Sequence, residues 1–506
     1  MTFVDNKRIA KNTILLYVRM IILMVVTLYT SRVILAVLGV DDYGIYSLIG
    51  GIIALFSFIS NALVNAMQRF FNVALGQRDE EKYHRVYVMG FNLLFLFSIF
   101  LLLVGETIGL WFVNNKLNIP DGRETAAFWV YQISIVTLIV HLLRTPDNAS
   151  IIAYEHMGFY AYLSIGEALL KLGIVFLLQV FAMDKLLLYV ILYLAATVLI
   201  NVAYKVYCNK MFAECRYHWL WDKKMFRDLL SFSGWSLLSN GSRTVTMQGE
   251  NIFLNQYYSV SVNAARGIAA QVYNAVNTFL TNFQTAFKPQ LTKSYAAGEM
   301  GNHYSLLYRS SKFSFYLLLV LVIPIIFNLD ALLGAWLVEV PLYTKEFCLF
   351  VLLAYLADAL ASPLGTSIAA NGNIRGLQIS IAVVFVIQLF ASFFALRAGW
   401  PPYIVSVFIL ISHTIHYLFY IYFCKKLCDL RLGEYFKKVL LPLIPICILA
   451  PCLPYYLQRY SSNIWSAILL CIVDVLWVLL FVWLIGLDKT EKSFIKSTVT
   501  KIIRRK

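Results

Sequence analysis

The stretch YVMGFNLLFLFSIFLLLVGETIGLWFV, residues 87–113, decides the class of fold. It contains a single charged residue, Glu106, and it is longer than the about 20 apolar residues that an α-helix needs to cross a bilayer. Similar apolar stretches, separated by short polar segments, make up almost the whole chain. Of the 506 residues, 60% are hydrophobic and only 14% are charged, which is too little charge to cover soluble domains. The sequence therefore predicts an all-α polytopic membrane protein.

The positions of these apolar stretches predict fourteen transmembrane helices. The spans at 228–254 and 267–287 are weakly hydrophobic, because Ser, Asn, Gln and Thr are frequent in them. Four prolines within 439–457 predict a kinked helix there. The predicted spans are residues 12–37, 44–67, 87–113, 126–143, 158–180, 186–204, 228–254, 267–287, 313–333, 347–368, 377–396, 403–424, 439–457 and 464–486.

The loops between the spans are short, and their charges are asymmetric. If the N-terminus lies inside, Lys and Arg are concentrated in the inner loops and scarce in the outer ones, as the positive-inside rule requires. An even number of spans then places both the N- and C-termini in the cytoplasm. The net charge of +15 is spread over these loops and not collected in one patch, so we expect no nucleic-acid partner.

The order of the spans indicates two lobes followed by extra helices. Six spans precede the long inner connection at 205–227, and a similar pattern of spans then begins again. We predict an N-terminal lobe at 1–208, a C-terminal lobe at 209–424, two extra helices at 425–486 and a basic cytoplasmic tail at 487–506. Repeated lobes of this kind are frequent in transporters, whose substrates bind near the bilayer midplane.

Four cationic side chains fall within the predicted spans, where a charge costs about 2.5–3.5 kcal/mol at the centre of a helix. They are Arg19, Arg32, Lys171 and Arg243. Such residues usually face a bundle interior or a hydrated cavity, so all four are candidate substrate-binding residues. Arg32 is close enough to the outer end of its span to snorkel to the interface equally well. Lys171 follows Glu167 by four residues, so a structural ion pair is favoured over a substrate role.

Arg243 is the strongest of these candidates, because it lies on a polar stripe of the seventh span, together with Glu250. The eighth span carries a comparable stripe, and the second span carries polar residues at helical spacing. Hydrogen bonding between helices explains a few such residues, but it explains two neighbouring polar spans poorly. We therefore favour a hydrated cavity lined by the first, second, seventh and eighth spans. Its further candidate substrate-binding residues are Asn61, Asn240, Gln271 and Asn274.

Two acidic residues within the spans are candidates for binding a coupling proton or cation. These are Glu250 and Asp358. The alternative for both is pairing with an intramembrane cation. For Asp330 and Asp474, such pairing or exposure near a helix end is the favoured interpretation.

The chain contains no known motif for catalysis, a cofactor or a metal. Walker and dinucleotide glycine patterns, H-E-x-x-H and G-x-S-x-G are all absent from the sequence. The eight cysteines have no metal-ligand spacing. His413 and His416 lack an acidic third ligand at metal spacing, so two packed core histidines are favoured. We therefore expect no catalytic residue, no metal and no cofactor, and a protein that is not an enzyme.

Two segments carry a resemblance to a known family. The first is LGVDDYGIY at 38–46, followed by Gly50-Gly51 and by QRFF at 68–71. The second is VNAARGIAAQ at 262–271, followed by PQ at 289–290. These motifs are similar to those of Wzx-type polysaccharide flippases, which form the polysaccharide-transporter branch of the superfamily that includes the MATE exporters and the lipid II flippases. The resemblance covers essentially the whole chain, and it does not indicate which sugar is carried.

This resemblance implies a MATE-like fold of two six-helix lobes around a cationic cavity, with two extra C-terminal helices. It implies a flippase of the bacterial inner membrane, which moves undecaprenyl-diphosphate-linked oligosaccharide repeat units from the cytoplasmic to the outer leaflet by alternating access. The product would serve assembly of capsule, exopolysaccharide or the O-antigen of lipopolysaccharide. The expected partners are this lipid-linked oligosaccharide, membrane lipids, and the polymerase and chain-length regulator of the same pathway.

Two alternative functions stay open. A MATE-like cation or drug antiporter needs a mainly acidic cavity, which the four intramembrane cations disfavour. A membrane polymerase or ligase of the same pathway usually needs a sizeable outer loop for its chemistry, and the longest outer loop here, residues 334–346, is short.

Overall fold

The computed structural model consists of helices and their connections. Throughout the described ranges the regular structure is helical, without a strand, which confirms the predicted all-α polytopic membrane protein. Contacts between residues divide the chain into two units, Met1–Asn240 with Thr285–Glu299, and Gly241–Gln284 with Met300–Lys506. The structure describes residues 6–54, 57–111, 113, 122–181, 183–258, 260–337, 340–461, 463–489 and 491–493.

The first unit is built on the helices of the N-terminal half. Its apolar core joins four of them through Ile49 of α1, Val130 of α5, Val175 of α7 and Leu186 of α8, all of which are buried. Because these helices are apolar on most faces, they bury one face in this core and leave the other for lipid. The helices are α1 (Asn6–Ala54), α2 (Ser57–Gln77), α3 (Glu80–Val104) with the π-helical turn η1 (Gly105–Gly109), α5 (Glu124–Leu143), α6 (Thr145–Ala153), α7 (Met157–Leu177) and α8 (Lys185–Met211), followed by the 3-10 turn η2 (Ala213–Cys215).

The second unit contains the helices of the C-terminal half. Leu280 of α10, Leu318 of α11 and Leu352 of α13 pack together in its core. Two long helices, α9 (Lys223–Tyr257) and α10 (Val260–Ala296), contribute residues to both units. The remaining elements are α11 (Met300–Phe327), α12 (Leu329–Trp336), α13 (Thr344–Asn371), α14 (Arg375–Arg397), α15 (Ile404–Cys428), α16 (Leu432–Tyr435), η3 (Phe436–Leu440), α17 (Leu441–Leu449), α18 (Cys452–Leu457), η4 (Gln458–Tyr460), α19 (Ile464–Phe481) and η5 (Val482–Gly486).

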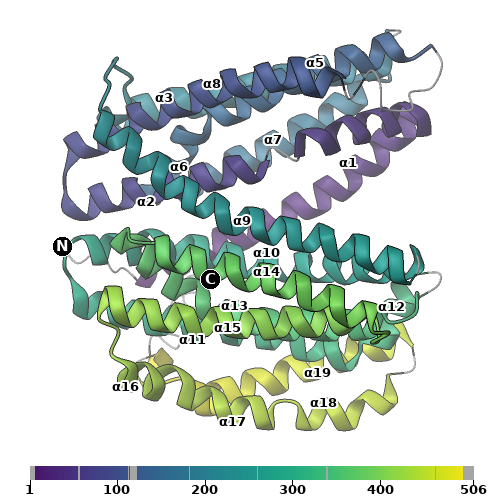
Figure 1. The fold of residues 1–506 in the computed structure, drawn as a ribbon, viewed down its shortest axis with the longest axis vertical. Helices are drawn as coiled ribbons and strands as arrows, with labels where there is room; N and C mark the ends of the chain where they lie inside the picture. The colour runs from purple at the N-terminus through teal and green to yellow at the C-terminus, as the bar shows by residue number, and fades with distance from the viewer. Residues whose placement is uncertain are drawn as a thin grey trace, which may run out of the picture. The chain divides into compact units, whose positions relative to one another are not determined.

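The main departure from the predicted spans lies in α1. The sequence predicts two spans, 12–37 and 44–67, with an outer loop between them, but the backbone is helical throughout Asn6–Ala54. Figure 1 shows the purple ribbon of α1 changing direction, so the chain reverses within helical backbone. Helical backbone satisfies its own hydrogen bonds, which favours it over an open loop at the edge of the membrane. The second span then continues into α2, after residues 55–56, which lie outside the described residues.

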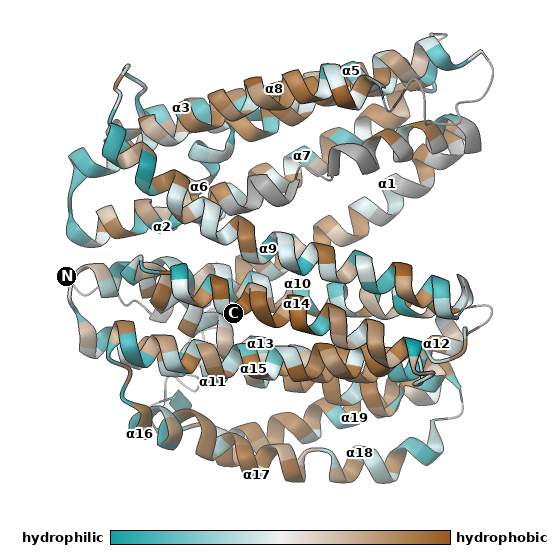
Figure 2. Cartoon of the chain, viewed as in Figure 1, coloured by the Kyte–Doolittle hydropathy of each residue, from teal (hydrophilic) through white to brown (hydrophobic). Residues whose placement is uncertain are grey.

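In the described part of the chain, ten helices are long and apolar enough to cross a membrane, and α1, α2, α9 and α10 are not among them. Of these four helices, α9 and α10 are the least hydrophobic. This agrees with the weak hydropathy predicted for 228–254 and 267–287. Figure 2 shows brown, apolar ribbon along α5, α8 and α17, whereas α9 is paler. In the proline-rich span at 439–457, for which the sequence predicts a kinked helix, α17 ends at Leu449 and α18 begins at Cys452.

Candidate functional site

A cavity of about 430 Å³ lies within the first unit, among α1, α6, α7 and α8, with Arg144 from the junction of α5 and α6. Three cationic residues line it, Arg19, Arg144 and Lys171, and only one acidic residue, Glu167. The cavity therefore holds an excess of two positive charges. Aromatic hydroxyl-bearing side chains form much of the remaining wall, and they are Tyr46, Tyr160, Tyr189, Tyr193 and Tyr204.

Glu167 is shared between two of the cations. Its Oε1 lies 3.0 Å from Nζ of Lys171, and its Oε2 accepts a hydrogen bond of 3.0 Å from Nη1 of Arg144. The i,i+4 pair of Glu167 and Lys171 expected from the sequence is thus formed, and Lys171 lines the cavity as well. Both cations also lie over aromatic rings, Lys171 over Tyr193 at 4.9 Å and Arg144 over Tyr204 at 5.0 Å.

Arg19 is the cation of the cavity that has no carboxylate partner among the described residues. Its guanidinium carbon lies 4.5 Å from the centroid of the Tyr160 ring, which orients the side chain from α1. Its Nε is buried and has no hydrogen-bond partner in the described part of the chain. A charged donor left in this way is available to an anionic ligand, because a guanidinium binds phosphate or carboxylate with two parallel hydrogen bonds.

The structure places Arg243 in the second unit, so it does not share the cavity of Arg19 and Lys171. Nη2 of Arg243, on α9, donates a hydrogen bond of 3.0 Å to the hydroxyl of Tyr273, on α10. In the same unit, Oδ2 of Asp358 on α13 lies 2.8 Å from Nδ1 of His413 on α15. The contact between Asp358 and His413 could not be predicted from the sequence, because nothing in the spacing of these residues indicates that α13 and α15 pack together.

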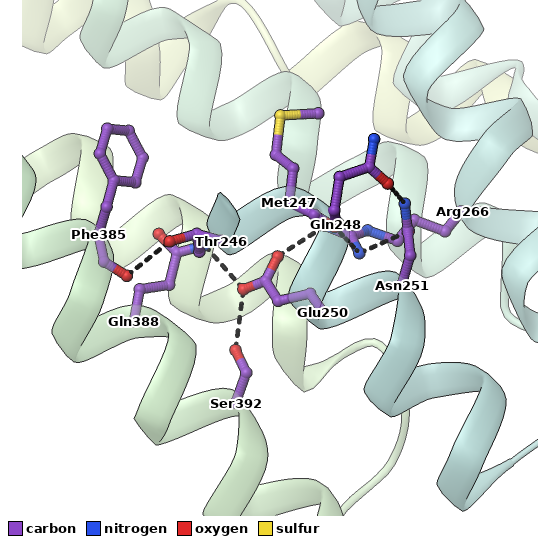
Figure 3. Close-up of polar contacts among 9 residues, drawn as sticks. All are labelled: Thr246, Met247, Gln248, Glu250, Asn251, Arg266, Phe385, Gln388 and Ser392. Carbon is purple, nitrogen blue, oxygen red and sulfur yellow. Dashed lines mark hydrogen bonds and ion pairs between the residues drawn. The ribbon is translucent and has the colours of Figure 1, made fainter. Parts of the chain in front are cut away.

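Glu250 is completely buried in a network that joins three helices of the second unit (Figure 3). Its Oε2 accepts a hydrogen bond of 2.6 Å from Nη2 of Arg266 on α10. Its Oε1 accepts from Gln388 at 2.8 Å and from Ser392 at 2.9 Å, both on α14. Arg266 also donates to Oδ1 of Asn251 at 2.8 Å. Glu250 is therefore paired with a cation, Arg266, which is the alternative that the sequence leaves open beside a coupling role.

The predicted location of Arg266 is wrong. The predicted spans place it in the outer connection before 267–287, but it is buried inside α10, which begins at Val260. Its place within the motif VNAARGIAAQ is the signal that could have indicated a structural role. The sequence does not single out Arg144 as a cavity residue either, because it directly follows the span predicted at 126–143. Cations are common at the ends of membrane-spanning helices. The cavity tyrosines Tyr189 and Tyr193 are four residues apart, a spacing that puts both on one helix face.

The other predicted site residues fall in several surroundings. Gln271 and Asn274 have exposed side chains on α10, and Asn240 is half-buried on α9. The side chains of Arg32 and Asn61 lie outside what the structure describes. Asp330, in the first turn of α12, is exposed and pairs with Lys345, as expected. No group of three metal-binding side chains occurs among the described residues.

Asp474 contradicts its predicted surroundings. The sequence favours either an ion pair or exposure near a helix end, but Asp474 is 1% exposed and has no cationic partner among the described residues. It is instead bonded to the amide of Asn328, which is 146 positions away in the sequence. A contact over that separation depends on how α19 packs, which the residue spacing does not reveal.

Comparison with known proteins shows the fold. No protein-family model matches the chain, and no curated protein matches it. Among solved structures, an outward-facing multidrug resistance MATE family transporter of the MOP superfamily is similar, with a TM-score of 0.69 and 13% identity over 84% of this chain and 96% of that one. The crystal structure of a MATE protein in the straight conformation gives a TM-score of 0.68 with 13% identity, over the same shares of the two chains. A MOP superfamily transporter from Pyrococcus furiosus gives 0.66 with 12% identity, over 85% of this chain and 96% of that one. The chain therefore has the fold of the MATE transporters of the MOP superfamily.

Proposed function

We propose that this protein is a membrane transporter of the flippase type, which moves undecaprenyl-diphosphate-linked oligosaccharide units from the cytoplasmic to the outer leaflet. The observation that supports this function best is the cavity of the first unit, with its excess of two positive charges. A diphosphate that links a lipid to a sugar carries two negative charges at neutral pH. The cavity and this ligand therefore match in sign and in amount of charge.

The side chains of the cavity suit such a ligand chemically. Arg19 keeps a buried Nε without a partner among the described residues, and it can donate to phosphate oxygens. Lys171 and Arg144 keep further donors beyond those given to Glu167, because an ammonium has three and a guanidinium five. The tyrosine hydroxyls can exchange hydrogen bonds with sugar hydroxyls. Alternating access would then carry the bound headgroup across the membrane while the lipid tail stays in the bilayer.

The polarity of the cavity also disfavours the main alternative. A MATE-like antiporter for cations or cationic drugs would bring a positive ligand into a positive cavity, and juxtaposed like charges cost several kcal/mol. The similar transporter from Pyrococcus furiosus is described as having a binding pocket of reverse polarity that suggests a different function. A change of polarity within this fold is therefore compatible with a change of substrate. A polymerase or ligase is disfavoured by the short outer loops, so we regard the protein as a non-enzyme.

The proposed function implies a membrane, a pathway and partner proteins. It belongs in the bacterial inner membrane, with both termini in the cytoplasm, in a pathway for capsule, exopolysaccharide or O-antigen. The polymerase and the chain-length regulator of that pathway are the partners that would use its product. Deletion of the gene should make complete single repeat units accumulate on the inner leaflet. Their accumulation on the outer leaflet would point to a polymerase instead, and no accumulation would revive the exporter.

The cavity is tested with Arg19→Ala in proteoliposomes that contain a lipid-diphosphate oligosaccharide. The rate of its appearance on the far leaflet is measured with an impermeant glycosidase. Loss of a hydrogen bond to a charged group costs about 1.5–3 kcal/mol, so we expect a fall of about tenfold or more. Arg431→Ala is the matched control, because it removes an equal charge from an exposed side chain of the second unit. Equal rates for the wild type and Arg19→Ala would contradict the assignment of the cavity.

A further inference from the structure

Asp474 lies in the middle of the face by which α19 packs against α11. The buried residues of α19 are Ala467, Leu470, Asp474 and Val478, so the acid interrupts an otherwise apolar stripe at helical spacing. The helix has ten residues before Asp474 and a similar length after it, which places the carboxyl group near the middle of the membrane. An ionised Asp at such a position costs about 2.5–3.5 kcal/mol.

Asp474 differs from every other deeply buried acid that the structure describes. Five acidic residues are less than one tenth exposed in the described part of the chain, and four of them have a cationic partner within 4.0 Å. Asp474 is the exception, so no cationic side chain among the described residues compensates a negative charge on it. The four pairs are Asp147 with Lys205 at 3.9 Å, Glu155 with Lys293 at 2.9 Å, Glu250 with Arg266 at 2.6 Å and Glu491 with Lys312 at 2.7 Å.

The partner of Asp474 is the side-chain amide of Asn328, a residue between α11 and α12. Nδ2 of Asn328 donates one hydrogen bond of 3.0 Å to the carbonyl of Pro324 and another of 3.0 Å to Oδ2 of Asp474. Both hydrogens of the amide are thereby used. The orientation of the amide follows from chemistry, because the opposite orientation would face its oxygen toward two acceptors.

Two oxygen atoms stay without a hydrogen-bond partner in this arrangement. They are Oδ1 of Asn328 and Oδ1 of Asp474, and both are buried. If Asp474 is ionised, both atoms are acceptors, and each lacks a donor among the described residues. If Asp474 is protonated on Oδ1, it gains an O–H donor for the amide oxygen. The acid and the amide can then form a cyclic pair with two hydrogen bonds, in which both buried oxygens have a partner and no charge remains.

We propose that Asp474 is a proton-binding site, which keeps its proton at neutral pH by pairing with Asn328. One proton removes the uncompensated charge and also supplies the missing donor. This inference goes beyond the proposed function and does not depend on it. Because release of the proton would leave a bare negative charge in the apolar stripe, occupancy of the site controls the contact between α19 and α11. A proton gradient can act on a transporter through such a contact.

Within the described ranges, the other titratable groups on the neighbouring elements do not supply a counter-charge. Lys312 of α11 is engaged by Glu491, and Asp330 of α12 is engaged by Lys345. Cys471, one turn before Asp474 on α19, directs its Sγ to the carbonyl of Pro324 at 3.7 Å. On α17 and α18, Cys447, Tyr455 and Tyr456 are exposed.

The proposal is tested by infrared spectroscopy of the full-length protein in liposomes at neutral pH. A protonated carboxyl group has a carbonyl band that is distinct from the bands of a carboxylate and of amides. We expect this band in the wild type and its loss in Asp474→Asn, whose amide preserves the shape and can form the same cyclic pair. Asp330→Asn is the matched control and should leave the band unchanged, because that acid is exposed and ion-paired. Asn328→Leu should shift the band without removing it, because the hydrogen-bonded partner is lost.

Two results would overturn the proposal. Identical spectra of the wild type and Asp474→Asn would mean that Asp474 is ionised. A band that appears only after Na⁺ and K⁺ are removed would mean that a metal cation occupies the site. If Asp474→Asn does not fold, the wild type is treated with a hydrophobic carbodiimide, which modifies protonated carboxyl groups. An adduct on Asp474 supports the proposal, and adducts found only on other carboxyl groups refute it.

Discussion

Removal of Arg266 should destabilise the second unit strongly, because Glu250 would then hold an uncompensated charge in a fully buried position. Arg266 gives Glu250 the shortest bond of the network, 2.6 Å, and Gln388 and Ser392 supply only neutral donors. Removal of one partner of a buried ion pair typically costs about 3–5 kcal/mol. We expect Arg266→Met to lower the free energy of unfolding by about this amount. Glu250→Gln should cost a similar amount, because it leaves the guanidinium buried without its carboxylate.

A double-mutant cycle measures the interaction directly. Unfolding of the single and double variants is followed by tryptophan fluorescence during titration with SDS in mixed micelles. The double variant Arg266→Met with Glu250→Gln has no uncompensated charge, so we expect a coupling energy of about 2–3 kcal/mol. Ordinary polar contacts between membrane helices average about 0.6 kcal/mol. The exposed pair Asp330–Lys345 is the control and should give less than about 1 kcal/mol. A coupling for Glu250–Arg266 no larger than that of the control would refute this reasoning.

Two further predictions concern the first unit. Gly76→Ala should lower stability by about 1–3 kcal/mol, because a Cβ at Gly76 would lie 2.5 Å from the backbone oxygen of Lys293. Gly158→Ala, which meets nothing within 4 Å, is the control, and equal losses of thermal stability in the two variants would contradict the packing argument. Burial opposes ionisation of Asp184, but a hydrogen bond from Arg123 and the backbone N–H groups at the start of α8 outweigh it and lower its pKa. A lowered pKa stabilises the folded state above the pKa of an unfolded Asp, about 3.9, and this stabilisation is lost as the pH falls through the folded value. In Asp184→Asn, the temperature midpoint of unfolding should therefore fall less than in the wild type as the pH is lowered. An equal fall in both proteins would mean that Asp184 does not cause the loss of stability in acid.

The sequence predicts those features that depend on local geometry. Apolar stretches of membrane-spanning length locate most helices, because length and hydropathy alone decide whether a helix can cross a bilayer. The pair of Glu167 and Lys171 follows from the helical repeat, since residues four apart share a face. The low hydropathy of α9 and α10 is also visible in the sequence. In each of these examples, the information lies within a single helix.

Features that depend on packing between helices could not be predicted in this way. The contact of Asp474 with Asn328 and that of Asp358 with His413 each join two helices whose rotation about their axes the sequence does not specify. Arg266 illustrates a second reason. A difference of a few residues in where α10 begins decides whether this cation counts as a loop residue or as a buried one. Helix ends are hard to locate from a sequence, because they depend on capping and on local contacts that hydropathy does not show.

The sharing of Glu167 between two cations makes the cavity directional. Lys171 and Arg144 are already partly neutralised, whereas Arg19 meets no carboxylate among the described residues. The cation without a carboxylate therefore lies on α1, and the most negative part of a ligand can pair with it without displacing a carboxylate. Tyr46 and Tyr189, whose ring centroids are 5.2 Å apart, offer aromatic surface to the rest of the ligand. If the protein is the flippase that we propose, a headgroup held in this way would enter each transport cycle in a single orientation.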